Sequence, residues 1–246
     1  MKVDGSLALV TGGARGLGMA ITQRLLGNGA KVAVFDRDAA ALKSLPSGAL
    51  GMMVDVTQPE MVKAAVADLV AKHGPIQILI NNAGVIFSEP FINLERPSEL
   101  MHNYERFRES LVVNMDSVFI MTTAVVEQMV MRRTAGVVVN ISSVSAAGNA
   151  GQIAYSSAKA AVNAMTVTLA KELGRWGIRC NAVAPGFIGT ESTRRAMSAS
   201  ALTHVEENTP LRRLGTADEV AHAVVSLVEN DFINGEILRV DGGLRI

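Results

Sequence analysis

The stretch LALVTGGARGLGMAITQRLL, residues 7–26, decides the fold. Its first five residues form a short apolar run typical of a β-strand, and from Leu17 to Leu26 the apolar residues recur every three or four positions, as in an amphipathic helix. Between them stand Gly12, Gly16 and Gly18. A glycine-rich turn from strand into helix offers backbone N–H groups and the helix dipole to an anion such as a pyrophosphate. The spacing GxxxGxG differs from GxGxxG, and tight packing of helix on strand is the alternative reason for the glycines.

The same alternation of strand and helix continues along the chain. Seven apolar runs rich in β-branched residues predict strands: Leu7 to Thr11, Lys31 to Asp36, Ala49 to Val54, Ile76 to Asn81, Gly136 to Ile141, Ile178 to Ala184 and Ile237 to Val240. Most are separated by helix-length segments, namely Leu17 to Leu26, Met61 to Val70, Phe107 to Met129, Ala158 to Leu173 and Val220 to Val228. This order predicts a Rossmann-like, doubly wound α/β fold, with a seven-stranded parallel sheet and helices on both faces. Because no linker, repeat or low-complexity tract divides the chain, we expect one domain over residues 1–246.

Two segments break the alternation. Ile86 to Asn103 contains two prolines and is longer than a usual connection, and Gly186 to Asn208 is rich in Ser, Thr and Arg. Both would emerge at the carboxyl ends of strands, where open parallel sheets bind their ligands. We therefore expect a substrate lid at about residues 186–208 and a rim of the same pocket at residues 86–103, with plain surface loops as the alternative.

Composition excludes some classes of function. Lys and Arg number 23, as do Asp and Glu, so no overall charge of one sign draws the protein to nucleic acid or to an anionic membrane. The single cysteine, Cys180, cannot form an internal disulfide, and no Cys/His cluster has the spacing of metal ligands. The start MKVDGSLALVTGG lacks a long apolar stretch. We expect a cytoplasmic protein with a small-molecule partner and no metal.

Asp36 ends the second predicted strand, 18 residues after Gly18. A carboxylate there can accept hydrogen bonds from both hydroxyls of an adenosine ribose and would repel a 2′-phosphate, which favours NAD over NADP. Arg15 and Arg37 argue the other way, since a guanidinium can accept that phosphate, and a plain turn residue is the alternative for Asp36. Asp55 and Val56 close the third strand at the same edge.

The fourth strand ends in Asn81, Asn82, Ala83 and Gly84. Asparagines at this position can brace neighbouring strands or line an adenosine pocket, and the sequence leaves both possibilities open.

Tyr155 and Lys159 form a YxxxK pattern at the start of a predicted helix, which puts phenol and ammonium on one face. A nearby cation lowers the pKa of a phenol from about 10 and makes it a general acid or base. The fifth strand ends in Ser142 and Ser143, whose hydroxyls can donate to a carbonyl oxygen. Asn114 interrupts an apolar helix, where it holds a water on a proton path or bonds a neighbouring backbone group.

Together these motifs resemble the short-chain dehydrogenase/reductase family: TGGARGLG at 11–18, NNAG at 81–84, Asn114, NISS at 140–143, YSSAK at 155–159 and PGFIGT at 185–190. The resemblance implies that Tyr155 transfers the proton, Lys159 supports it and binds ribose, Ser143 orients the substrate oxygen and Asn114 holds a relay water. Family members usually place the serine 13 residues before the tyrosine, an offset that belongs to Ser142. We prefer Ser143 because the following loop resembles the common motif with one residue lost.

The same resemblance implies a set of NAD contacts drawn from the turn after the first strand, the ends of the second, third and fourth strands, and the segment after the sixth. These residues are Gly12, Arg15, Gly16, Leu17, Gly18, Asp36, Asp55, Val56, Asn82, Ala83, Gly84, Tyr155, Lys159, Pro185, Gly186, Ile188 and Thr190.

A narrower resemblance concerns the substrate. ENDFINGEILRVDGGLRI at the C-terminus and HNYERFRESLVVNM are similar to NAD-dependent 3-hydroxyacyl-CoA dehydrogenases that also oxidise hydroxysteroids and assemble as tetramers. The loop NISSVSAAGNAGQIAY is similar to bacterial 3-oxoacyl reductases. We expect hydride transfer between NAD(H) and a secondary alcohol or ketone, with a 3-hydroxyacyl-CoA favoured. A hydroxysteroid or cyclic alcohol, a 3-oxoacyl reductase activity, and an NAD-sensing regulator without chemistry are the alternatives.

Three further expectations follow. The apolar helices from Phe107 to Met129 and from Ala158 to Leu173 offer surface for a homotetramer. Arg194 and Arg195 on the lid could meet a CoA phosphate. The four histidines, His73, His102, His204 and His222, are expected to be solvated.

Overall fold

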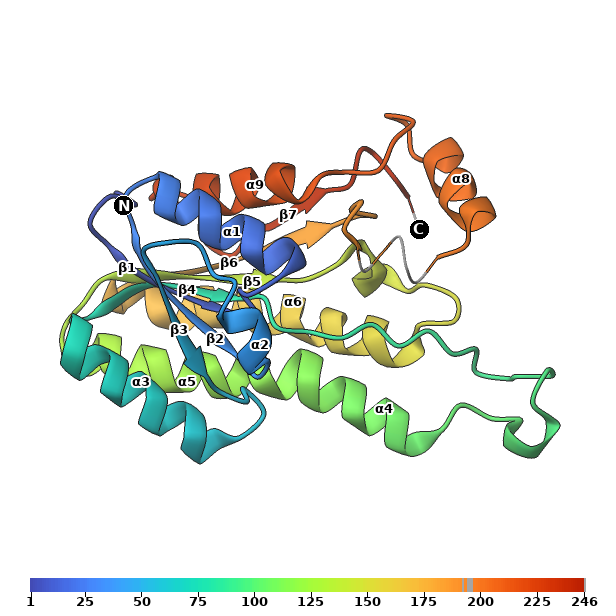
Figure 1. The fold of residues 1–246 in the computed structure, drawn as a ribbon, viewed down its shortest axis with the longest axis horizontal. Coiled ribbons are helices and arrows are strands. Elements are labelled where there is room, and N and C mark those ends of the chain that lie inside the picture. Colours follow the sequence, from blue (N-terminus) through green and yellow to red (C-terminus); the bar gives the residue numbers. More distant parts are fainter. Residues whose placement is uncertain (192, 194–196, 246) are drawn as a thin grey trace.

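The computed structural model describes residues 1–191, 193 and 197–245. Its seven strands are β1 (Leu7–Thr11), β2 (Lys31–Asp36), β3 (Ala49–Met53), β4 (Ile76–Asn81), β5 (Gly136–Ile141), β6 (Ile178–Pro185) and β7 (Ile237–Val240). They lie in the order β3-β2-β1-β4-β5-β6-β7, and every neighbouring pair is parallel. The predicted seven-stranded parallel sheet is confirmed, with β3 and β6 each one residue off their predicted ends (Figure 1).

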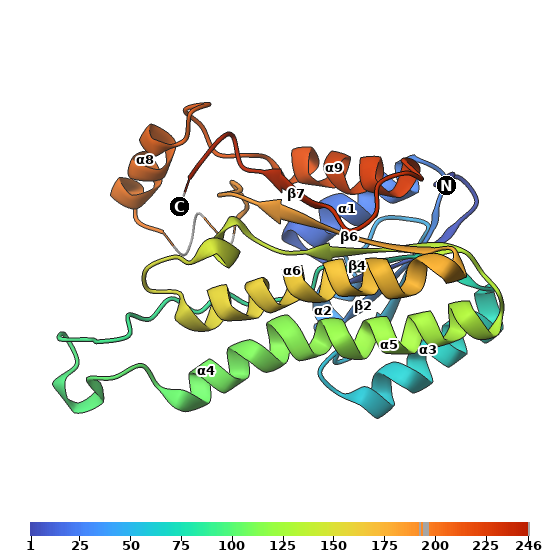
Figure 2. The same cartoon turned by 180° about the vertical axis from the view of Figure 1, so that it is seen from behind.

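Helices cover both faces of this sheet (Figures 1 and 2). One face carries α1 (Gly16–Gly27), α2 (Ala39–Leu42) and α9 (Ala217–Glu229), and the other carries α3 (Pro59–His73), α5 (Ser117–Met131) and α6 (Ile153–Leu173). Shorter elements are α4 (Tyr104–Leu111), α8 (Ala199–Asn208), the 3-10 turns η1 (Pro97–Glu99), η3 (Val144–Ala147) and η4 (Gly174–Trp176), and the π-helical turn η2 (Val112–Asp116). The doubly wound arrangement predicted from the alternation of strands and helices is therefore present.

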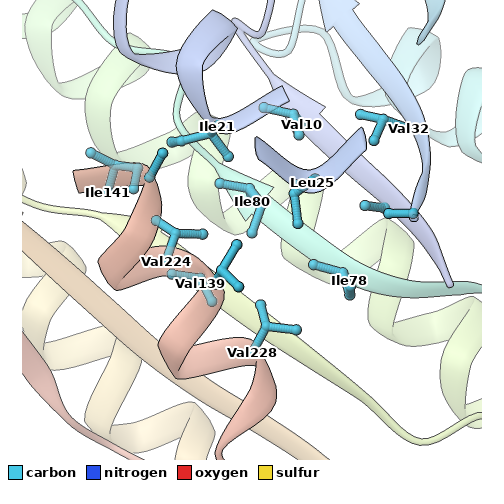
Figure 3. Packing of buried hydrophobic residues seen from close by; sticks show 14 of the residues in the cluster. Val10, Ile21, Leu25, Val32, Ile78, Ile80, Val139, Ile141, Val224 and Val228 are labelled. Atoms are coloured by element: carbon cyan, nitrogen blue, oxygen red, sulfur yellow. The ribbon is translucent and has the colours of Figure 1, made fainter. Parts of the chain in front are cut away.

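Alternate residues of each central strand supply the two cores. In β1, Ala8 and Val10 belong to the cluster under α1 and α9, whereas Leu7 and Leu9 belong to the cluster under α3 and α5. Figure 3 shows the first cluster, in which the strand residues Val10, Ile80 and Val139 meet side chains of α1 and α9. Complete burial of such a side chain contributes roughly 1.5–3 kcal/mol, so these two layers hold the strand ends in register.

The edge strand β3 departs from the predicted pattern. Its residues are apolar, yet Met53 is 67% exposed and Leu50 is exposed as well. An edge strand at the end of the sheet lacks the helix cover of the central strands, so apolar content alone did not indicate burial here.

The order of strands places a switch point between β1 and β4. From β1 the chain crosses outward to β2 and β3, and from β4 it crosses the other way to β5, β6 and β7. The loops after β1 and β4 therefore diverge at the carboxyl edge of the sheet, which is where doubly wound folds bind their ligands. The last residues of four strands lie at this edge: Thr11, Asn81, Ile141 and Pro185.

The predicted helix from Phe107 to Met129 is longer than expected and is interrupted. It runs from Tyr104 to Met131 through the π-helical turn η2, which contains Asn114. By length and composition alone this helix could cross a membrane. Its buried face carries the polar residues Ser110, Asn114 and Ser117, and it packs against α3 and α6. We therefore interpret it as a core helix whose irregular turn serves a site, as π-helical turns often do.

Residues 86–103, here called the arm, project from the body of the molecule beyond the carboxyl edge of the sheet (Figure 1). The arm folds back on itself: Ile92 and Met101 form an antiparallel bridge, and Asn93 N–H donates to the Leu100 carbonyl at 2.7 Å. Its exposed apolar side chains are Ile86, Phe91, Ile92, Leu94, Leu100 and Met101.

Candidate functional site

The turn between β1 and α1 is built around its glycines. Gly12 has φ +61° and Gly16 has φ +53°, the left-handed region that residues with a side chain rarely adopt. Gly18 is required for a steric reason, because a Cβ there would lie 2.1 Å from the carbonyl oxygen of Gly12. The glycine spacing therefore serves both backbone conformation and close packing.

Asn82 and Thr11 fasten this turn to the next loop. The Asn82 amide donates to the carbonyls of Thr11 (2.9 Å) and Gly12 (3.0 Å). In return the Thr11 hydroxyl accepts the N–H groups of Asn82 and Ala83, both at 3.0 Å. Sequence reasoning left the role of Asn82 open and missed Thr11, although it stands in the quoted glycine motif. The contacts join the two loops that diverge at the switch point.

The N-terminus of α1 is open to an anion. Its N-cap residue, Arg15, forms no side-chain cap within the described part of the chain, and the first turn carries no acidic residue. By contrast, Asp38, Asn103, Ser198 and Thr216 cap α2, α4, α8 and α9 with their side chains. Free N–H groups and the helix dipole at a glycine turn fit a pyrophosphate.

Two carboxylates stand where the second strand ends. Asp36 is 9% exposed, and its side chain accepts hydrogen bonds from Ala14 N–H at 3.3 Å and Asp38 N–H at 3.0 Å. Asp38, which sequence reasoning missed, forms an ion pair with Arg15. Backbone hydrogen bonds, chiefly from Ala41, lower the pKa of Asp38. Of the two guanidinium groups that could accept a ribose phosphate, that of Arg15 is thus paired with a carboxylate.

Asp55 and Val56 follow β3 at the same edge. The Asp55 carboxylate accepts the hydroxyl and the N–H of Thr57, at 2.7 and 2.9 Å, and these two bonds lower its pKa. Val56 is buried. This turn fixes the course of the chain between β3 and α3.

The side chain of Asn81 links two neighbouring strands. Its amide donates to Asn140 Oδ1 at 2.8 Å and to Thr122 Oγ1 at 3.0 Å, and Asn140 donates to Thr166 Oγ1 at 2.9 Å. Asn81 and Asn140 are register partners in β4 and β5. Of the two roles left open by the sequence, the structure shows the first for Asn81: it ties β4 to β5 and to the helices behind them.

Asn114 holds the loop after β4. Its amide donates to the Val85 carbonyl at 2.8 Å and to the Ser110 carbonyl at 3.0 Å, and its oxygen accepts Val85 N–H at 3.1 Å. A Cβ on Gly84 would lie 2.7 Å from Asn114 Oδ1 and 3.7 Å from Lys159 Nζ. Asn114 therefore bonds backbone groups, and it does so beside the ammonium of Lys159.

The two serines after β5 point to different partners. Ser142 is buried and donates to Asn163 Oδ1 at 2.6 Å, within the body of α6. Ser143 lies close enough to the Tyr155 hydroxyl to lower the pKa of that phenol, and the Ser143 oxygen accepts Ser145 N–H at 3.1 Å. Ser143 rather than Ser142 therefore lies beside the phenol, whatever the offset along the chain.

Tyr155 and Lys159 are both buried near the start of α6. Burial raises the pKa of the Tyr155 phenol, and the hydrogen bond from Ser143 partly opposes this. Burial lowers the pKa of Lys159 to about 8. The net pKa shift of Tyr155 is thus opposite to the lowering expected from the sequence, because burial of the phenol dominates. Lys159 Nζ donates to the Ile141 carbonyl at 2.8 Å and lies 5.6 Å from the centre of the phenol ring.

The segment after β6 begins as a packed turn. Gly186 N–H donates to the Val240 carbonyl at 2.9 Å, and Ile188, 7% exposed, forms a bridge with Gly215. Thr190 Oγ1 lies 2.9 Å from Thr193 Oγ1. Arg194 and Arg195 lie outside the described residues. A cavity of about 230 Å³ beside this segment is lined by Phe187, Thr209, Leu211, Arg213, Gly215, Glu219, Arg239, Val240, Asp241 and Gly242, which include none of the expected catalytic residues.

His102 corrects an expectation. Its side chain is 6% exposed rather than solvated, and its Nδ1 lies 3.2 Å from Glu89 Oε2. Arg106 Nη1 lies 2.8 Å from the other oxygen of the same carboxylate. These contacts close the base of the arm, and nothing in the spacing of Glu89, His102 and Arg106 along the chain had indicated them.

A glycine turn at the switch point of a parallel sheet, with a serine, phenol and ammonium at the neighbouring strand end, defines a dinucleotide-dependent oxidoreductase. A family model described as enoyl-(acyl carrier protein) reductase matches residues 12–245. Together with the relatives below, this match shows that the chain belongs to the short-chain dehydrogenase/reductase family, which uses nicotinamide cofactors.

Three relatives illustrate the match. 3-Oxoacyl-[acyl-carrier-protein] reductase FabG of Escherichia coli (strain K12) is 35% identical over 250 residues, which cover 99% of each chain. The protein of the same name from Thermotoga maritima is 36% identical over 256 residues and all of both chains. 3-Hydroxyacyl-CoA dehydrogenase type-2 of Homo sapiens is 33% identical over 256 residues, all of this chain and 97% of the relative.

Proposed function

We propose that this protein catalyses reversible hydride transfer between NAD(H) and C3 of a 3-hydroxyacyl or 3-oxoacyl thioester, with a CoA ester as substrate. One observation carries the proposal: Ser143, after β5, acts on the buried Tyr155 phenol, which stands one helical turn from Lys159, and Lys159 Nζ donates to the last carbonyl of β5, that of Ile141, at 2.8 Å. Two adjacent hydroxyls suit a substrate oxygen that changes between alcohol and carbonyl.

In the oxidation direction the substrate hydroxyl proton passes to Tyr155 Oη as the C3–H bond breaks. Bound NAD would accept the two electrons and the hydrogen of that bond as hydride. Ser143 donates a hydrogen bond to the substrate oxygen, and the ammonium of Lys159 favours the phenolate form of Tyr155. We assign Asn114 to hold Gly84 and Val85 beside Lys159 and to bind a relay water there. Reduction is the same sequence in reverse.

The residues of the cofactor half fit a dinucleotide. The uncapped N-terminus of α1 and the turn of Gly12, Gly16 and Gly18 would receive the pyrophosphate, with Arg15 and Leu17 beside it. Asp36 would bind the adenosine ribose, and Lys159 the nicotinamide ribose. The remaining proposed contacts are Asp55, Val56, Asn82, Ala83, Gly84, Tyr155, Pro185, Gly186, Ile188 and Thr190.

NAD is proposed over NADP because the ribose position is acidic. Asp36 and Asp38 both lie there and would repel a 2′-phosphate, and Asp38 pairs with Arg15. Arg37, the other guanidinium at this edge, lies close enough to Asp55 to lower the pKa of that carboxylate. The preference is measured as the ratio of kcat/KM for NADH and NADPH. Asp36→Ala should shift this ratio about tenfold toward NADPH, the effect of losing roughly 1.4 kcal/mol of discrimination. An unchanged ratio would remove Asp36 from the ribose site.

The second candidate is a 3-oxoacyl reductase that acts on an acyl carrier protein, which the likeness to FabG of two organisms supports. A hydroxysteroid or cyclic-alcohol dehydrogenase is a further alternative. The three differ in substrate, so one assay separates them: acetoacetyl-CoA, acetoacetyl-acyl carrier protein and a ketosteroid are each reduced with NADH. The proposal predicts the highest kcat/KM for the CoA ester, and a higher value for either other substrate would replace it.

We further propose a single domain whose residues 186–208 act as the substrate lid, in a cytoplasmic homotetramer without nucleic-acid or membrane partners. The outer face of α5 supports the assembly, since Phe119 and Met131 are 62% and 77% exposed. Light scattering at working concentration should give four times the chain mass, and the mass of a single chain would refute the assembly.

A further inference from the structure

Gln152 directly precedes the helix that carries Tyr155, and it breaks a local rule. It is the N-cap residue of α6, yet glutamine is not among the residues that cap helices well, and its side chain makes no cap bond to the described residues. Helix starts are usually stabilised by Ser, Thr, Asp or Asn, as at α2, α4, α8 and α9. A departure from local preference often marks a residue used for something else.

The Gln152 side chain instead joins three segments. Its Oε1 accepts the Ser145 hydroxyl at 3.0 Å and the Asn149 amide at 3.1 Å, and its Nε2 donates to Ser88 Oγ at 3.3 Å. In this orientation of the amide, Oε1 faces the Asn149 donor and Nε2 faces Ser88. Both ends of the side chain are thus used, one toward the turn after β5 and one toward the arm.

From Ser145 the contacts continue to the proposed catalytic pair. Ser145 N–H donates to Ser143 Oγ at 3.1 Å and occupies an acceptor position of that hydroxyl, which leaves its hydrogen for Tyr155. Ser145 is 5% exposed, so water does not compete freely for these groups. The bonds form a closed path, since Tyr155 lies on the helix that Gln152 begins.

We propose that Gln152 is a positioning residue, which acts through Ser145 to set the direction of the Ser143 hydroxyl toward Tyr155. The inference rests on the proposed function, in which those two hydroxyls share the substrate oxygen. Gln152 does not touch the reacting atoms in this account; it decides whether Ser143 is aimed at them.

The same residue connects the arm to the site. Besides the bond from Gln152 to Ser88, the neighbouring Glu89 N–H donates to the Gly151 carbonyl at 2.8 Å. These two bonds hold the base of the arm against the loop that leads into α6. Since the positioning role uses only Oε1, removal of Ser88 Oγ should leave it intact, and Ser88→Ala is therefore the matched control.

A double-mutant cycle tests the path. Gln152→Met keeps the length of the side chain and removes its hydrogen bonds, and Ser145→Ala removes the intermediate hydroxyl. With acetoacetyl-CoA and NADH, each single variant should lower kcat about tenfold with KM for NADH unchanged, and the double variant should lower it no further. Ser88→Ala, which leaves both bonds to Oε1 in place, should lower kcat far less than Gln152→Met does. Gln152→Glu, which keeps an acceptor oxygen, should recover most of the loss. Additive losses, or a wild-type kcat in Gln152→Met, would overturn the proposal.

An experiment without turnover separates this inference from the proposed function. The chain has two tyrosines, so Tyr104→Phe leaves Tyr155 as the only phenol that titrates. The interaction with Ser143 lowers the pKa of Tyr155. If the Ser143 hydroxyl points elsewhere in Gln152→Met and Ser145→Ala, the midpoint of Tyr155 ionisation should therefore rise by roughly half to one pH unit. The midpoint should not change in Ser88→Ala. Circular dichroism at each pH restricts the comparison to folded protein. Equal midpoints refute the inference, whereas a wild-type protein that shows these shifts but turns over no acyl thioester refutes only the proposed function.

Discussion

The two halves of the site are built by different means. On the β1 and β4 side, the site is shaped by the backbone. Its features are glycines in the left-handed region, a close approach at Gly18, and the bonds that Asn82 and Thr11 make to main-chain groups. On the β5 and α6 side, side-chain bonds set the geometry: Gln152 holds the Ser145 hydroxyl, and the Ser145 N–H holds the Ser143 hydroxyl. The first half should therefore fail when a single Cβ is added, and the second when a single hydroxyl or amide is removed.

The largest expected effect lies in the side-chain half. Tyr155→Phe removes the proton carrier and leaves the glycine turn intact, so kcat should fall by about 10²–10⁴-fold while the Kd for NAD changes far less, because Tyr155 is one of many proposed NAD contacts. Steady-state kinetics and calorimetric titration with NAD measure the two quantities. Tyr104→Phe, at an exposed position on α4, is the control and should keep both. A parallel loss of NAD binding in Tyr155→Phe would contradict the division into halves.

The backbone half is tested by Gly18→Ala. The added Cβ would lie 2.1 Å from Gly12 O, so the turn must shift and the affinity for NAD should drop roughly tenfold to a hundredfold, the equivalent of about 1–3 kcal/mol. Gly27→Ala at the other end of the same helix meets no atom within 4 Å and serves as the control. If both variants bind NAD alike, the close approach at Gly18 is not needed for the cofactor.

Lys159→Met should separate activity from stability. Burial lowers the pKa of this ammonium from 10.5 to about 8, so at neutral pH the folded protein carries a buried charge that costs on the order of 3 kcal/mol. The folded state then becomes more stable as pH rises from about 8 toward 10.5, where the unfolded chain holds a proton that the folded chain has released. Lys159→Met should be inactive, more stable than wild type near neutral pH, and level with it above that window.

Denaturant unfolding at several pH values measures this difference. A Lys159→Met protein that is less stable than wild type at neutral pH would mean that the bond to the Ile141 carbonyl outweighs the cost of burial.

The smallest expected effect concerns the arm. Glu89→Gln removes the charge that pairs with Arg106 and lies beside His102, and loosening by about 1 kcal/mol should increase proteolytic cleavage within residues 90–101 about fivefold. The global unfolding midpoint should not change, because the arm packs outside both cores. Glu95→Gln, exposed near the tip of the arm, is the control. Equal cleavage rates would show that the ion pairs do not close the arm.

The backbone half of the site was largely predictable from sequence, and the reason is physical. The glycine spacing, the apolar runs and the acidic end of β2 are local features of the sequence. Each one constrains a backbone conformation or the end of a strand. Because the strands are parallel, their carboxyl ends then lie at one edge of the sheet. The strands were predicted to within one residue for the same reason.

In the side-chain half, the sequence indicated only the residues expected to act on the substrate, namely Tyr155, Lys159 and the serine pair. YxxxK and the serine pair are visible in the sequence, but the choice of Ser143 over Ser142 depends on which hydroxyl faces α6 and which faces Tyr155. No periodic pattern or motif in the sequence connects Gln152 with Ser145 or Ser88. His102 was assigned to solvent because its partner Glu89 lies across the fold of the arm, which no sequence pattern predicted.

The central claim is that Tyr155 exchanges a proton with the substrate oxygen while hydride moves between the nicotinamide ring and carbon. Reduction of acetoacetyl-CoA by NADH that carries deuterium at both positions of C4, followed by mass spectrometry of the product, tests it most directly. We expect deuterium at C3 of 3-hydroxybutyryl-CoA with wild type and a rate of labelling at least about a hundredfold lower with Tyr155→Phe. Product without the label, or equal labelling rates in the two proteins, would contradict the account.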